Sequence, residues 1–173
     1  MLFGDPANFA VEAYHEIPKN FGASGLWGRM CIHIAGQMFG DISEQSCQLD
    51  HAILSLHSLS QRQEELWHEA LDGKTDTEIF DFLDTALYKD VGRSREQMRS
   101  DWFHFGGFSF LTNWGEQFDY APKAFIYSRH KLTRVVWRVH DGQVEGADIA
   151  SSDFSEVAEV AHNWYSRETV PPL

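Results

Sequence analysis

Cysteine is scarce in this sequence. Among 173 residues only Cys31 and Cys47 are cysteines, and neither belongs to a Cys-x-x-Cys pair. Small secreted domains usually carry more, because disulfides compensate for a limited core. We therefore interpret both as free, at least partly buried thiols in a reducing cytoplasm. The N-terminus also lacks the basic and apolar regions of a signal peptide, and no apolar run approaches the roughly 20 residues that span a bilayer.

Basic residues are also few. The chain has 14 Lys and Arg against 26 Asp and Glu, which gives a formal net charge of −12. Nucleic acid and anionic membrane would both repel such a chain, so we expect neither as a partner. A basic protein partner fits better, although acidity that only maintains solubility explains the composition equally well. With 43% hydrophobic and 14% aromatic residues, the chain can still bury a sizeable core.

Motifs of catalysis and cofactor binding are missing. There is no Gly-x-Ser-x-Gly elbow and no glycine-rich phosphate loop. Glu65 and His68 are three residues apart on a predicted helix, as in di-iron bundles, but such sites need the pair twice. Cys31 and His33 share a predicted strand face and could form half a zinc site, for which no second half is visible. We therefore predict no cofactor, no metal and no enzymatic activity. A small metal-dependent or hydrolytic enzyme using Glu65 and His68 is one alternative.

Hydrophobic periodicity predicts two strands near the N-terminus. Residues 8–15 and 30–35 alternate in the way that is typical of half-buried strands. The glycine-rich residues 18–28 form a loop between them, and Gly40-Asp41 forms a turn after the second strand.

The middle of the chain predicts helices. Apolar residues recur at three- and four-residue steps over residues 49–71, which predicts one long helix that stops near Gly73. Thr75 and Glu78 have the spacing of a capping box at the start of a second helix. A third, shorter helix is predicted over residues 94–103.

The C-terminal half predicts a sheet followed by a helix. Strands are predicted over residues 108–112, 123–128, 134–139 and 143–149, the last two joined by a hairpin turn at Asp141-Gly142. The final helix is expected to be capped by Asp153, with Glu156 three residues later. This order of elements predicts one α+β domain over residues 1–173, with a largely antiparallel sheet packed by three to four helices.

The negative charge is concentrated in the middle of the sequence. Residues 41–90 contain twelve acidic and three basic residues, a local charge of −9, while the other 123 residues contribute −3. These helix faces are either solvated surfaces or an electrostatic face that speeds encounter with a cationic partner. In the second case aromatic anchors would supply much of the affinity. The predicted partner-binding residues are Glu65, Glu69 and Asp72 on one helix face, Asp81, Asp84 and Tyr88 on the next, and Trp114 and Tyr120, for which core packing is equally plausible.

A family resemblance bears on this choice. Residues 2–6, Leu-Phe-Gly-Asp-Pro, followed by Phe9-Ala10-Val11, resemble the start of the immunity protein 42 family of polymorphic-toxin and contact-dependent inhibition systems. The strand with Gly28 and Gly36, the turn at Gly40-Asp41, and Val135-Val136-Trp137-Arg138 before Asp141-Gly142 are similar as well.

The resemblance implies a cytoplasmic bacterial protein that binds the C-terminal domain of a cognate toxin and blocks it. Many such toxins are basic nucleases, which suits an acidic inhibitor. The Gly-Asp-Pro motif is typical of a turn and is therefore interpreted as structural. The resemblance accordingly transfers no active or binding residue to this chain. A general acidic adaptor, with no toxin involved, remains the other alternative.

Overall fold

The computed structural model describes residues 1–16, 25–44, 47–139 and 142–169. Over these residues the strands form two antiparallel sheets, which confirms the predicted α+β class. The division into two sheets is a feature that strand periodicity did not predict. Residues 18–24 of the predicted first loop and Asp141 of the predicted hairpin turn lie outside the described residues.

The N-terminal sheet has the strand order β1-β2-β3-β4, and a short strand β5 also pairs with β3. Its strands are β1 (Leu2–Asp5), β2 (Phe9–His15), β3 (Trp27–Ile34), β4 (Gln37–Phe39) and β5 (Cys47–Gln48). The turn after β1 is closed by Asp5, whose carboxylate accepts a hydrogen bond from the Ala7 amide at 2.9 Å. This is the turn chemistry expected of the Gly-Asp-Pro motif.

The C-terminal sheet has the order β6-β7-β8-β9. Its strands are β6 (Ser109–Phe110), β7 (Ala124–Arg129), β8 (Leu132–Arg138) and β9 (Val144–Ala150). The predicted strand over residues 108–112 is wrong in length, because Leu111 and Asn113 adopt positive φ angles of 64° and 62°. Extended pairing cannot continue through that left-handed backbone.

The described residues contain four α-helices: α1 (Asp50–Gln61), α2 (Asp76–Tyr88), α3 (Arg95–Phe105) and α4 (Ser151–Thr169). The capping box of Thr75 and Glu78 is confirmed at the start of α2. Asp153 is not the cap of the last helix, because α4 already begins at Ser151 and Asp153 lies in its first turn. In the described part of the chain, no helix is both long and apolar enough to cross a membrane.

The prediction of one helix over residues 49–71 is wrong. The helix α1 ends at Gln61, and the chain continues through two 3-10 turns, η1 (Gln63–Glu65) and η2 (Glu69–Leu71). Between them the Leu66 carbonyl accepts a hydrogen bond from Ser128 on β7 at 2.7 Å. Leu66 packs in one hydrophobic core and Leu71 in another. The apolar spacing therefore reflects two cores that the segment contacts in succession.

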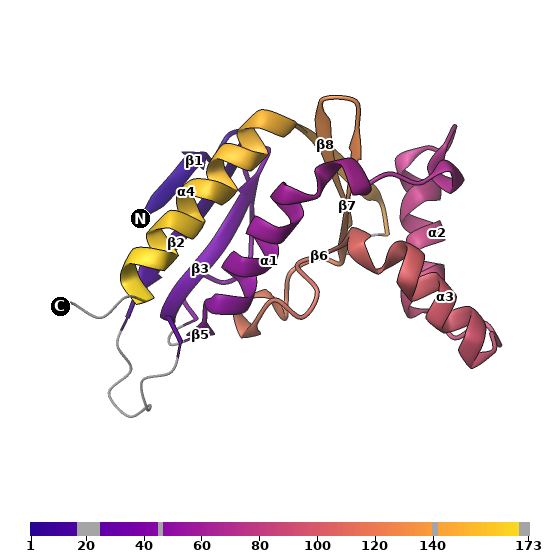
Figure 1. Ribbon diagram of the computed structural model, residues 1–173, viewed down its shortest axis with the longest axis horizontal. Helices are drawn as coiled ribbons and strands as arrows, with labels where there is room; N and C mark the ends of the chain where they lie inside the picture. The colour runs from indigo at the N-terminus through magenta and orange to yellow at the C-terminus, as the bar shows by residue number, and fades with distance from the viewer. Residues whose placement is uncertain (17–24, 45–46, 140–141, 170–173) are drawn as a thin grey trace.

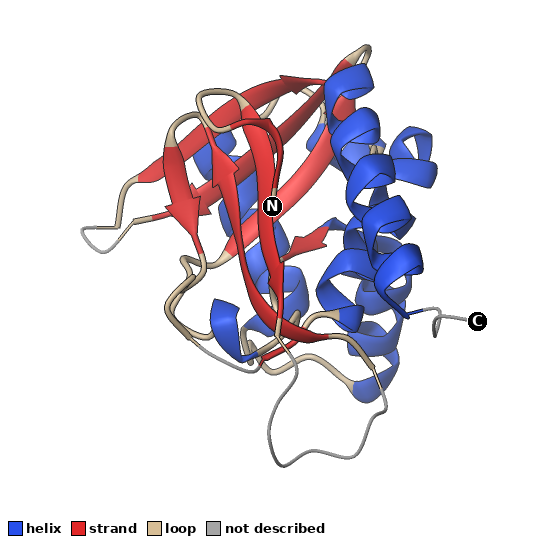
Figure 2. Ribbon diagram, turned by 90° about the vertical axis from the view of Figure 1, so that its left-hand side faces the viewer, coloured by secondary structure: helices blue, strands red, loops and turns tan. Residues whose placement is uncertain are grey.

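Two hydrophobic cores share the C-terminal sheet. The main core lies between the inner face of the N-terminal sheet, helices α1 and α4, and one face of the C-terminal sheet, to which Ile126 and Trp137 contribute. The second core lies between the other face of that sheet, with Phe125 and Val136, and helix α2. Figure 1 shows α1 and α4 across strands β1 to β3, with α2 and α3 at the opposite end of the molecule. Figure 2 shows the helices gathered on one side of the N-terminal sheet.

Candidate protein-binding surface

The connection between α1 and α2, residues 62–74, carries a group of exposed acidic residues. Glu64, Glu65, Glu69 and Asp72 are exposed, and none of them forms an ion pair with any residue that the structure describes. Because this connection is built from 3-10 turns, these carboxylates do not line one helix face as predicted. We call the four residues the acidic connection.

The two predicted binding carboxylates of α2, Asp81 and Asp84, are paired with cations instead. Asp81 pairs with Arg138 on β8 at 2.7 Å. Asp84 is buried and lies 2.7 Å from the Lys123 ammonium and 3.2 Å from that of Lys89. Burial alone would raise the pKa of Asp84, but hydrogen bonds from the two lysines outweigh it and hold the pKa below its ordinary value. Much of the negative charge counted on α2 is therefore neutralised by ion pairs within the protein.

The three aromatic residues predicted to bind a partner also differ in their exposure. Tyr88 is half-buried, with its hydroxyl 2.6 Å from Ser109 Oγ and the Lys123 ammonium 4.5 Å from its ring centre. Trp114 is only 4% exposed and packs against Phe110, so it belongs to the core, as the alternative interpretation held. Tyr120 is 91% exposed and free to contact a partner.

Helix α3 presents aromatic residues that the sequence analysis did not single out. Phe105 is the one buried residue of this helix. Met98, Trp102 and Phe103 are 43%, 56% and 84% exposed. The spacing of Met98, Trp102 and Phe105 at i, i+4 and i+7 was the available signal, but it predicts a buried stripe rather than an exposed one. Exposed aromatic and methionine side chains are enriched where proteins bind one another.

The acidic connection and α3 are neighbours. The His68 ring, within the connection, lies 5.0 Å from the Phe105 ring and 6.1 Å from the His104 ring, centre to centre. Trp102 also lines a groove of about 410 Å³ together with Leu54 and Leu59 of α1. The connection that carries these carboxylates therefore packs against α3 through His68 and Phe105.

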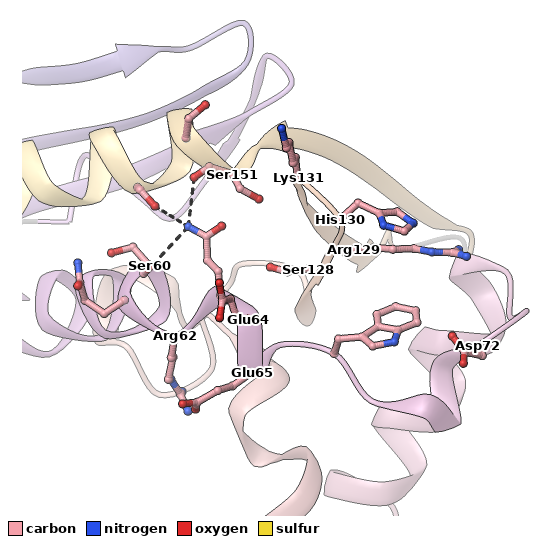
Figure 3. Close-up of a pocket in the computed structure, with 15 residues that line it drawn as sticks. Ser60, Arg62, Glu64, Glu65, Asp72, Ser128, Arg129, His130, Lys131 and Ser151 are labelled. Atoms are coloured by element: carbon pink, nitrogen blue, oxygen red, sulfur yellow. Dashed lines mark hydrogen bonds between the residues drawn. The ribbon is translucent and has the colours of Figure 1, made fainter.

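A wide cleft opens on the other side of the acidic connection. Its volume is about 940 Å³. Figure 3 shows Glu64 and Glu65 among its lining residues, with Arg129 at the end of β7 and His130 and Lys131 of the β7–β8 turn above them. Both signs of charge thus face one open cleft, an arrangement that suits a large polar partner.

The polar side chains at the base of this cleft are bonded to each other. Gln63 Nε2 donates to Ser155 Oγ at 2.6 Å and to the Ser151 carbonyl at 3.2 Å (Figure 3). The Thr133 hydroxyl donates to Gln63 Oε1 at 2.9 Å. This network ties η1, which follows α1, to the start of α4 and to β8. Gln63 therefore acts as a structural bridge.

The predicted pairing of Glu65 with His68 on one helix face is wrong, because the helix has already ended. Glu65 lies in η1, whereas His68 precedes η2, where its Nδ1 accepts a hydrogen bond from the Ala70 amide at 3.0 Å. In the described part of the chain, the group of side chains with metal-ligand spacing contains neither residue. The helical spacing that suggested a metal pair at Glu65 and His68 is therefore absent.

Comparison with known proteins adds independent information. The family model described as immunity protein 42 matches residues 1–164. Among solved structures, the crystal structure of CdiI from Burkholderia dolosa AUO158 is similar to this chain with a TM-score of 0.67 and 11% sequence identity, covering 95% of this chain and 99% of that one. At this identity the likeness shows a shared fold. No curated protein gives a match.

Proposed function

Because the chain belongs to the immunity protein 42 family, we propose that it neutralises a cognate bacterial toxin by binding to it. The match over residues 1–164 is the single observation that carries this function, since it spans both sheets, helices α1 to α3 and most of α4. Inhibition by binding requires a surface rather than a catalytic site. The protein then acts stoichiometrically, in the cytoplasm, on the C-terminal domain of the toxin.

The charge of the protein indicates the character of that toxin domain. At a net charge of −12 the chain would attract a basic domain and repel an acidic one. Basic toxin domains include nucleases, whose own substrate is a polyanion. An acidic inhibitor on such a domain competes electrostatically with the nucleic acid.

We place the toxin-binding surface on the acidic connection and the exposed face of α3. The acidic connection supplies carboxylates that form no ion pair with the residues that the structure describes, which favours fast, steered encounter. Trp102 and Phe103 supply apolar area beside them, and buried aromatic side chains carry much of the energy of protein interfaces. The two features together distinguish this end of the molecule from the other charged surfaces.

Binding to the toxin domain encoded next to this gene tests the function. The purified proteins are mixed and followed by size-exclusion chromatography and stopped-flow kinetics. A one-to-one complex is expected, with an association rate that falls as salt rises because the steering charges are screened. A pair that does not associate at low salt would overturn the proposal. An adaptor without a toxin would bind some other protein and leave this toxin active.

Matched variants test the location of the surface. Glu69→Lys reverses a charge in the acidic connection, and Glu156→Lys does the same on exposed α4. The first should slow association several-fold at low salt, and the second should have little effect. Phe103→Ala should weaken the complex by about 2 kcal/mol if the ring is an anchor. Tyr120→Ala provides the comparison, and a larger loss there would move the interface to the β6–β7 region.

A further inference from the structure

The outer face of the N-terminal sheet carries a cluster of three different donor side chains. Val11 and Ile32 point inward and pack in the main core. Because side chains alternate along a strand, Glu12 on β2 and Cys31 and His33 on β3 point to the opposite face. Glu12 and Cys31 are direct partners in the β2–β3 register, and His33 follows Cys31 by two residues. The antiparallel pairing thus places the three side chains together.

The donor atoms of this cluster converge. His33 Nε2 lies 3.1 Å from Glu12 Oε2, Cys31 Sγ lies 3.5 Å from His33 Nε2, and Cys31 Sγ lies 3.9 Å from Glu12 Oε2. The possible ligand atoms of these three side chains all lie within 4.8 Å of one another. Glu12 is the partner that was missing when the sequence suggested only half a zinc site.

These separations match the edges of a metal coordination polyhedron. Zinc binds sulfur at about 2.3 Å, imidazole nitrogen at about 2.0 Å and carboxylate oxygen at about 2.0–2.2 Å, tetrahedrally. Such bond lengths place the ligand atoms about 3.3–3.6 Å from each other. The three separations in the cluster deviate from that range by a few tenths of an ångström, which small side-chain rotations can accommodate.

We propose that Glu12, Cys31 and His33 form a zinc site on the outer face of the N-terminal sheet. The thiolate, the imidazole and the carboxylate supply three ligands, and water supplies the fourth. The fourth position faces solvent, because the side chains of His33 and Glu12 are 16% and 26% exposed. The site joins β2 to β3 and is independent of the toxin-binding function.

The surroundings support this assignment. Tyr14 donates a hydrogen bond from its hydroxyl to Glu12 Oε1 at 2.7 Å, which leaves Oε2 directed at the cluster. Partners of this kind orient metal-ligating carboxylates. Burial, reinforced by the Glu12 charge, raises the pKa of the Cys31 thiol to about 12, so zinc has to displace a proton from this cysteine in order to bind. When zinc binds, the S–H bond breaks, a Zn–S bond forms and the proton passes to the buffer.

Zinc titration of the reduced, metal-stripped full chain tests the site. Isothermal calorimetry in two buffers of different ionisation enthalpy measures both affinity and proton release. One zinc ion per chain is expected, together with release of about one proton and an increase in melting temperature. Cobalt(II) in place of zinc should give a thiolate-to-metal charge-transfer band. Absence of saturable zinc binding would show that the three groups are only hydrogen-bonded to each other, and would overturn the proposal.

Variants separate this site from adventitious binding. His33→Gln and Cys31→Ser should each weaken zinc binding at least tenfold, and Cys31→Ser should abolish the cobalt charge-transfer band. Tyr14→Phe should weaken binding about tenfold, since it removes the group that orients Glu12. Cys47→Ser alters the other buried cysteine and should leave zinc binding unchanged. Equal affinity in the wild type and His33→Gln would overturn the assignment even if Cys31→Ser failed to fold.

Discussion

The two sheets of this protein differ in how many of their faces are buried. The N-terminal sheet buries one face against α1 and α4, and its other face carries Glu12, Tyr14 and His33. The C-terminal sheet is buried on both faces, because the main core covers one and α2 covers the other. The sequences follow this difference: β2 places polar residues at alternate positions, whereas β7 reads Ala-Phe-Ile-Tyr, all buried. The uncovered face of the N-terminal sheet can carry polar side chains. The second buried face of the C-terminal sheet holds α2 in place, and α3 follows α2.

The largest expected effect tests whether the second face of the C-terminal sheet is a true core. Phe125 is fully buried and packs edge-to-face on Phe80 of α2, with ring centres 5.0 Å apart. Phe125→Ala should lower the free energy of unfolding by about 3–5 kcal/mol, measured by urea denaturation. Leu2→Ala, on the outer face of the N-terminal sheet and 52% exposed, should change it by about 0.5 kcal/mol or less. Equal effects would show that the two sheets do not differ as described.

A smaller effect is expected at the ion pair that docks α2 onto the C-terminal sheet. Arg134 Nε donates to Asp76 at 2.8 Å, Tyr127 donates to the same carboxylate at 2.9 Å, and Arg134 also lies 2.9 Å from Asp148. The Arg134 hydrogen bonds hold the pKa of Asp76 below its ordinary value. The stabilisation is therefore fully present above the pKa of the unfolded chain, about 3.9, and is lost as pH falls through the lower folded-state pKa.

The substitution Asp76→Asn should accordingly cost about 1–3 kcal/mol at neutral pH, less than a fully buried pair because both partners are about a quarter exposed. Urea denaturation at a series of pH values measures the difference between wild type and variant. That difference should shrink as the solution is acidified below the unfolded-state pKa. Asp81→Asn, at the more exposed pair with Arg138, is the control and should cost about 1 kcal/mol or less. A difference independent of pH would contradict this account of α2 docking.

The smallest effect is expected in α3. This helix buries only one of its residues, so its stability depends more on the capping of its ends. The Ser94 hydroxyl accepts the Gln97 amide at 3.2 Å, and the Gln97 side chain accepts the Ser94 amide at 2.8 Å. Ser94→Ala should cost about 1 kcal/mol. Hydrogen exchange should show the loss as faster exchange within residues 95–105, with β7 and β8 unaffected. Thr75→Ala makes the matched change on the well-packed α2, where exchange should respond less.

Local patterns in the sequence predicted much of the fold. The strand alternation of residues 8–15 and the capping box of Thr75 and Glu78 depend on neighbouring residues only, and both are confirmed. The prediction of one helix over residues 49–71 was wrong because contacts with two different cores produced a single apolar spacing in the sequence. The prediction that Asp84 lies on the solvent face of α2 is wrong for a related reason, because the burial and pairing of this carboxylate depend on Lys123, which is distant in the sequence.

The sequence by itself determined the α+β class, the cap of α2, the excess of acid and the family. These follow from composition and from contacts a few residues apart. The tertiary structure decided which carboxylates stay unpaired, which aromatic side chains reach solvent, and that Glu12 lies opposite Cys31. Each of these depends on strand register and on how helices cover the sheets, and register joins residues such as Glu12 and Cys31 that are far apart in the chain.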